Sequence, residues 1–77
     1  MKIQVLGTGC PKCKKLYENA LIAAQQSGAA TEVVKVEDIG EITNFGVMIT
    51  PALAIDDDVK SVGKVLSPDE IKKLIAG

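Results

Sequence analysis

Two cysteines separated by two residues, Cys10 and Cys13, stand between two contrasting stretches of this chain. The apolar run at residues 2–6 has the length of a buried strand, and the glycine-rich residues 7–9 indicate a tight loop after it. Apolar side chains then recur at helical spacing, and Pro11 suits the first position of a helix. The cysteine pair is therefore predicted to lie where a strand turns into the first turn of a helix.

A second strand and a short helix are predicted to follow the first helix. The helical pattern should reach Ser27, where Gly28 ends it. β-Branched residues at 31–36 indicate a strand, and Asp38 can cap a short helix that extends to Asn44. A strand, a helix and a strand in this order form a right-handed parallel unit.

The remaining sequence predicts a hairpin and a third helix. Residues 52–55 and 59–62 have the pattern of two strands joined by a polar turn at 56–58, with Gly63 ending or bulging the second strand. Residues 67–70 have the form of a capping box before an amphipathic helix. The expected order is β-α-β-α-β-β-α, an α/β fold with a central mixed four-stranded sheet flanked by helices. With 77 residues the chain has room for a single domain, 1–77.

The charge balance and the apolar runs exclude several classes of function. Nine lysines, no arginine and ten carboxylates give a net charge of -1, which argues against a nucleic-acid partner. No apolar run has the length of a signal peptide or of a membrane span of about 20 residues, so we expect a soluble cytoplasmic protein. In a reducing compartment, one Cys-x-x-Cys pair indicates redox or metal chemistry rather than a framework of disulfides.

The predicted position of the pair assigns different roles to its two cysteines. Cys10 would occupy the N-cap of the helix, where free amides and the helix dipole lower a thiol pKa from about 8.5 towards neutral. Lys12 and Lys14 would add positive charge beside it. Cys13 would lie on the inward side of the first turn. We therefore expect Cys10 to attack a substrate disulfide and Cys13 to resolve the mixed disulfide.

Three alternatives use the same residues. The cysteines can be ordinary small core residues, or the two thiolates can carry Cu(I) as a metallochaperone does. They can also form a structural or regulatory disulfide in a non-catalytic adaptor. Small heavy-metal domains, however, have the order βαββαβ, and the Met that usually precedes their motif is replaced here by Thr8. Zinc would need more ligands than two cysteines in a chain without histidine. We predict no resident metal or other cofactor.

Three segments together resemble the thioredoxin superfamily, most closely its small redox-active disulfide proteins: residues 7–13, 46–53 and 70–75. The resemblance spans nearly the whole chain and implies a thioredoxin-like fold. It also implies that Pro51 is cis and lies beside the cysteines, and that Thr50 offers its backbone to an extended substrate.

The activity that follows is thiol–disulfide oxidoreduction by the Cys10 and Cys13 couple, in electron transport and cell redox homeostasis. We expect the protein to act as a monomer that reduces disulfides of proteins or small molecules. Its electrons would come from an upstream disulfide reductase or a low-molecular-weight thiol. Two thioredoxin features are missing, because Gln4 replaces a buried aspartate and Gly9 replaces a tryptophan. Proton transfer to Cys13 therefore lacks its usual carboxylate.

Other conspicuous residues are predicted to have structural roles. Tyr17 follows Cys13 by about one helical turn and is expected to be a half-buried core residue. The acidic residues 56–58 lack the spacing of a calcium loop and indicate a solvated turn. Phe45 and Met48 are expected to pack in the core or to line an apolar rim for a partner.

Overall fold

The computed structural model describes residues 1–27 and 31–76, and within them the predicted element order is confirmed. Gly28, the expected end of the first helix, lies outside the described residues. No helix in the described part of the chain is long and apolar enough to cross a membrane. The elements are β1 (Lys2–Leu6), α1 (Pro11–Ser27), β2 (Glu32–Val36), α2 (Ile39–Asn44), β3 (Ala52–Ile55), β4 (Asp58–Val62) and α3 (Pro68–Ala76).

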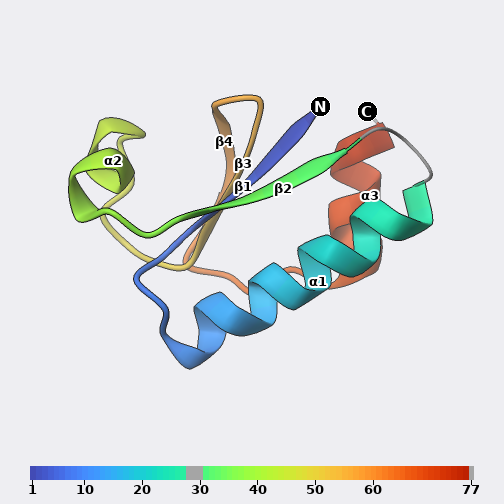
Figure 1. Cartoon of the computed structure of the whole chain (residues 1–77), viewed down its shortest axis with the longest axis horizontal. Coiled ribbons are helices and arrows are strands. Elements are labelled where there is room, and N and C mark those ends of the chain that lie inside the picture. The colour runs from blue at the N-terminus through green and yellow to red at the C-terminus, as the bar shows by residue number, and fades with distance from the viewer. Residues whose placement is uncertain (28–30, 77) are drawn as a thin grey trace.

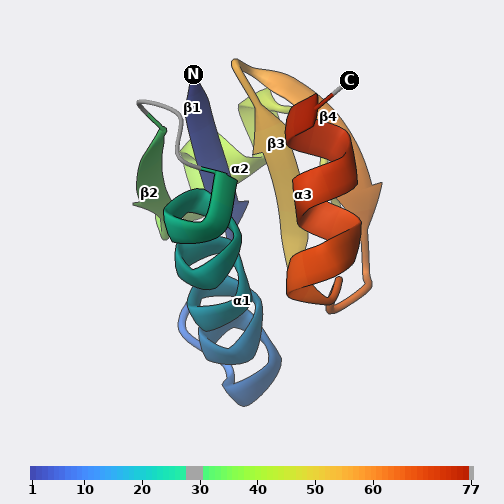
Figure 2. The same cartoon turned by 90° about the vertical axis from the view of Figure 1, so that its right-hand side faces the viewer.

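The four strands form one mixed sheet in the order β2-β1-β3-β4. Strand β1 pairs in parallel with β2 and antiparallel with β3, and β3 forms a hairpin with β4. Helices α1 and α3 lie side by side on one face of the sheet, and α2 lies on the opposite side (Figures 1 and 2). The predicted α/β fold, with helices on both faces of a mixed sheet, is confirmed.

Alternating side chains of the strands divide the core into two layers. Ile3 and Val5 of β1 face α1 and α3, where Leu16 and Ile71 are fully buried. On the other face, Leu6 packs with buried residues of β2, α2 and β3. Both layers are built mainly from aliphatic side chains, as expected from a sequence with no tryptophan and one phenylalanine.

The hairpin turn differs from its prediction in length. Strand β4 begins at Asp58 rather than at residue 59, because the turn consists of Asp56 and Asp57 with φ values of 50° and 70°. Two consecutive residues with positive φ fit the tight turn that matches the twist of a hairpin, and aspartate tolerates this conformation. The irregularity in pairing lies opposite Leu53 and Ala54, whereas Gly63 ends the strand with a φ of 73°.

The turn also satisfies a buried polar side chain on β1. Gln4 is 5% exposed, and its amide oxygen accepts a hydrogen bond from the Asp57 backbone N–H at 2.8 Å. Its amide nitrogen donates to the Asp57 carboxylate at 2.8 Å. The Lys2 backbone N–H donates to the Asp56 carboxylate at 2.8 Å. The acidic turn thus holds β1 in place, which agrees with a turn rather than a calcium loop.

The predicted caps of α2 and α3 both form. The Asp38 carboxylate accepts the Gly40 backbone N–H at 2.7 Å at the start of α2. At the start of α3, the Ser67 backbone N–H donates to the Glu70 carboxylate at 3.1 Å, and the Glu70 N–H donates to the Ser67 hydroxyl at 3.2 Å. The hydrogen bond from the Ser67 backbone is the main cause that lowers the pKa of the Glu70 carboxyl.

Candidate active site

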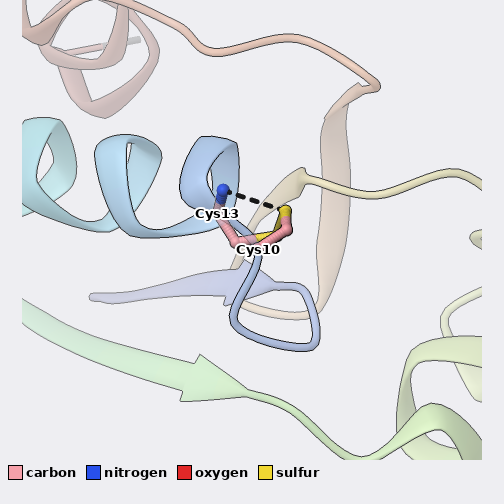
Figure 3. The surroundings of a disulfide bond; sticks show 2 residues. All are labelled: Cys10 and Cys13. Carbon is pink, nitrogen blue, oxygen red and sulfur yellow. Dashed lines mark hydrogen bonds between the residues drawn. A yellow bond between two sulfur atoms is a disulfide. The ribbon is translucent and has the colours of Figure 1, made fainter.

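The cysteine pair lies at the first turn of α1, where the sequence predicted it. The Cys10 carbonyl accepts the Lys14 backbone N–H at 3.0 Å, which is the first α-helical hydrogen bond and makes Cys10 the N-cap. Cys10 and Cys13 form a disulfide with a Cα–Cα distance of 5.0 Å. Figure 3 shows the disulfide at the junction between the loop and the helix.

The helix N-terminus donates directly to the sulfur of Cys10. The Cys13 backbone N–H lies 3.2 Å from Cys10 Sγ and donates a hydrogen bond to it (Figure 3). Cys10 is partly exposed, whereas Cys13 is buried with 5% of its surface accessible. A partner molecule can therefore reach Cys10 more readily than Cys13.

Gly7, which sequence analysis treated only as part of the loop, determines how closely β1 approaches the disulfide. A Cβ atom on Gly7 would lie 2.9 Å from Cys13 Cβ and would overlap Cys13 Sγ. The same point lies 3.9 Å from Thr50 Cβ. Only glycine leaves room here, and its missing side chain brings the end of β1, the disulfide and Thr50 together.

The segment before β3 has the geometry that the family resemblance implied. The peptide bond between Thr50 and Pro51 is cis. Pro51 is fully buried and its carbonyl accepts the Gly63 backbone N–H at 2.7 Å, while Thr50 is partly exposed. Thr50 therefore borders the disulfide with some of its surface open to a partner.

The charges around the pair come from two elements. Lys12 and Lys14 are exposed on the first turn of α1. An acidic residue that the local sequence does not predict here, Glu37, lies just after β2. One of its carboxylate oxygens is 3.7 Å from the point that a Cβ atom on Gly9 would occupy. The parallel pairing of β1 with β2 places it there.

A small cavity separates Cys13 from this end of β2. Its volume is about 60 Å³, and Cys13, Tyr17, Lys35 and Glu37 are among its lining residues. The Lys35 ammonium lies 4.5 Å from the centre of the Tyr17 ring. Tyr17 also packs against the larger core cluster, so it is half-buried as expected but contacts the site as well.

Apolar side chains are exposed on the other side of Thr50. Met48 is 94% exposed and Ile39 is 70% exposed, and both line a hollow of about 290 Å³ together with Thr50. Phe45 instead packs against the smaller core cluster. Met48 thus lies in the exposed apolar rim, whereas Phe45 lies against the core.

No group of three or more metal-binding side chains occurs among the residues that the structure describes. The acidic turn residues 56–58 take part in the β1 contacts and the hairpin rather than gathering around one point. The two sulfurs at the site are joined in a disulfide, and only their reduced, thiolate form would offer soft metal ligands.

Comparisons with known proteins agree with this geometry. A family model described as the thioredoxin domain matches residues 1–76. A thioredoxin from Methanocaldococcus jannaschii is 45% identical over 71 residues, which cover 92% of this chain and 81% of that protein. A thioredoxin from Methanothermobacter thermautotrophicus is 40% identical over 76 residues, which cover 99% of both chains.

Proposed function

Because this chain belongs to the thioredoxin family and is a thiol–disulfide oxidoreductase, we propose that it reduces substrate disulfides with Cys10 as nucleophile and Cys13 as resolving thiol. The observation that carries the assignment is the position of Cys10 at the N-cap of α1, with the Cys13 N–H directed at its sulfur. The family assignment favours this activity over a copper chaperone or a non-catalytic adaptor.

The first step is attack by the Cys10 thiolate. The free amides and the dipole of α1 stabilise negative charge at this sulfur, and Lys12 and Lys14 on the same turn add to the effect. Attack on a substrate disulfide forms a bond between Cys10 and one substrate sulfur. The other substrate sulfur leaves with the electron pair of the broken bond.

The second step is resolution by Cys13. Its Cα lies 5.0 Å from that of Cys10, within the range that a disulfide requires. Cys13 attacks the Cys10 sulfur, the disulfide to the substrate breaks, and the second substrate sulfur leaves as a thiol after taking up a proton. The dithiol has then lost two electrons and the substrate disulfide has gained them.

The surface beside Cys10 suits an extended disulfide-bearing segment. Thr50 offers backbone groups next to the disulfide, and the exposed Met48 and Ile39 offer apolar contact. We propose that the protein acts as a cytoplasmic monomer on protein or small-molecule disulfides, and contributes to electron transport and redox homeostasis. A disulfide reductase or a low-molecular-weight thiol would regenerate the dithiol.

Trapping of the mixed disulfide tests the order of attack. Reduced Cys13→Ser protein mixed with a disulfide-linked peptide should accumulate a covalent adduct at Cys10, visible by mass spectrometry. The matched Cys10→Ser protein should accumulate little adduct, because Cys13 is buried. Equal adducts on the two variants, or an adduct on Cys13 alone, would contradict the assignment.

A further inference from the structure

The proposed mechanism, on which this inference rests, leaves one proton without a destination. Cys13 must lose its thiol proton before it can attack Cys10, because only the thiolate is the nucleophile. Cys13 is 5% exposed, so bulk water has little direct access to it. Gln4, six residues before Cys10, has no acidic group and is held by Asp57 on the face of the sheet away from α1.

The cavity between α1 and β2 provides a route for this proton. Its volume of about 60 Å³ exceeds several-fold the roughly 15 Å³ that a water molecule needs. The Tyr17 hydroxyl, the Lys35 ammonium and the Glu37 carboxylate are polar groups of its lining residues. A cavity of this size with polar partners can hold water that connects Cys13 with its rim.

Glu37 is the group at this cavity that can accept a proton. Among the described residues that line it, Glu37 alone carries a carboxylate. The side-chain hydrogen bonds and ion pairs of the described residues do not involve this carboxylate, so it is available to water. Lys35 is a positive charge two residues away, held over the Tyr17 ring.

We propose that Glu37 takes the Cys13 proton through water in this cavity during the resolving step. The proton passes from Cys13 Sγ to the water, and the water gives a proton to the Glu37 carboxylate. The Cys13 thiolate then forms the bond to Cys10 as the bond between Cys10 and the substrate breaks. Glu37, which is exposed, releases the proton to solvent, and the route runs backwards when the disulfide is reduced.

A substitution that removes the Glu37 charge distinguishes this role from a simple electrostatic effect, because the two predict opposite changes in the rate of resolution. A nearby negative charge raises a thiol pKa, so removing it by Glu37→Gln would increase the thiolate fraction of Cys13 and speed resolution. Loss of a proton acceptor would slow resolution instead. General acid–base groups contribute about 10²–10⁴-fold in rate, and with solvent as a competing acceptor we expect a slowing of about tenfold near neutral pH.

A stopped-flow reaction with an aromatic disulfide that releases a coloured thiol reports the two steps separately. Attack by Cys10 releases the first coloured thiol, and resolution by Cys13 releases the second. We expect Glu37→Gln to slow the second phase and leave the first phase within about twofold, since the general-base role concerns Cys13 alone. The defect should shrink as pH rises, because hydroxide then removes the proton directly.

Glu32→Gln is the matched control, since Glu32 is exposed at the start of β2 and does not line the cavity. It removes the same charge and should leave both phases as in the unmodified protein. A second phase in Glu37→Gln that is unchanged or faster, or a defect that does not depend on pH, would overturn the role of Glu37. Absence of the first phase in the unmodified protein would instead overturn the proposed function.

Discussion

The contact between Gly7 and Cys13 predicts a large effect from a single added methyl group. In Gly7→Ala, the new Cβ would lie 2.9 Å from Cys13 Cβ and would overlap the Cys13 sulfur, whereas carbon atoms pack best at about 3.5–4.0 Å. The Cys13 side chain cannot move away freely, because it is held by α1 and by the disulfide. The backbone of Gly7 is not left-handed, so alanine meets no conformational strain there.

Two opposing terms set the expected magnitude. Overpacking a core position costs about 1–3 kcal/mol, and the overlap with the sulfur places this site near the upper end. Replacing glycine by alanine stabilises by about 0.4–1 kcal/mol through the unfolded chain. The expected net loss is about 2 kcal/mol, a large part of the roughly 4–12 kcal/mol available to a domain of this size.

Urea unfolding of the oxidised protein measures this loss as a lower midpoint. With a slope of about 1 kcal/mol per molar for a small protein, the midpoint should fall by about 2 M. Cys13→Ala removes the sulfur that the new methyl group meets and also the disulfide, so the double variant is compared with Cys13→Ala alone, and Gly7→Ala should cost less in that background. An unchanged midpoint, or the same loss in both backgrounds, would refute the packing argument.

Three further predictions concern other contacts. Asn19 is buried and donates to the Leu66 carbonyl at 2.9 Å, so Asn19→Ala should cost about 1–3 kcal/mol in urea unfolding, and an unchanged midpoint would count against it. Ser67→Ala should cost about 1 kcal/mol through loss of the α3 cap. The cap lowers the pKa of Glu70 below its usual 4.5 in the folded protein. The ionised Glu70 carboxylate therefore contributes to folding stability above pH 4.5, and this contribution is lost as pH falls through the pKa of the folded protein. Glu70→Gln should flatten this part of the stability profile; an unaltered acid profile would argue against the cap. Lys14→Gln should slow alkylation of Cys10, because the charge of the exposed Lys14 favours the thiolate. The slowing should be less than tenfold and should be larger at low salt than at high salt.

Local signals allowed much of the fold to be predicted from the sequence. Asp38 and Ser67 cap helices through hydrogen bonds to residues two or three positions away, so short segments contain the whole cause. The N-cap position of Cys10 follows in the same way from the apolar run before it and Pro11 after it. The hairpin boundary was wrong by one residue, because the positive φ values at Asp56 and Asp57 depend on how the two strands twist together.

The parts of the site that could not be predicted depend on pairing between distant segments. The parallel register sets Val5 beside Lys35, which brings the end of β2 and Glu37 to the cavity next to Cys13. Nothing in the sequence around Gly7 indicates that the sulfur of Cys13 occupies the space that a side chain at position 7 would need. The cis peptide bond before Pro51 is predicted only by the family resemblance, because the Thr50-Pro51 dipeptide alone favours trans.

The acidity of Cys10 is the most direct test of its role as the attacking thiol. The ultraviolet absorbance of the thiolate, followed against pH in the reduced protein, should show one group that titrates below the ordinary thiol value of about 8.5. This group should disappear in Cys10→Ser and persist in Cys13→Ser. If both thiols titrate near 8.5, or if the acidic group persists in Cys10→Ser, then the N-terminus of α1 does not activate Cys10.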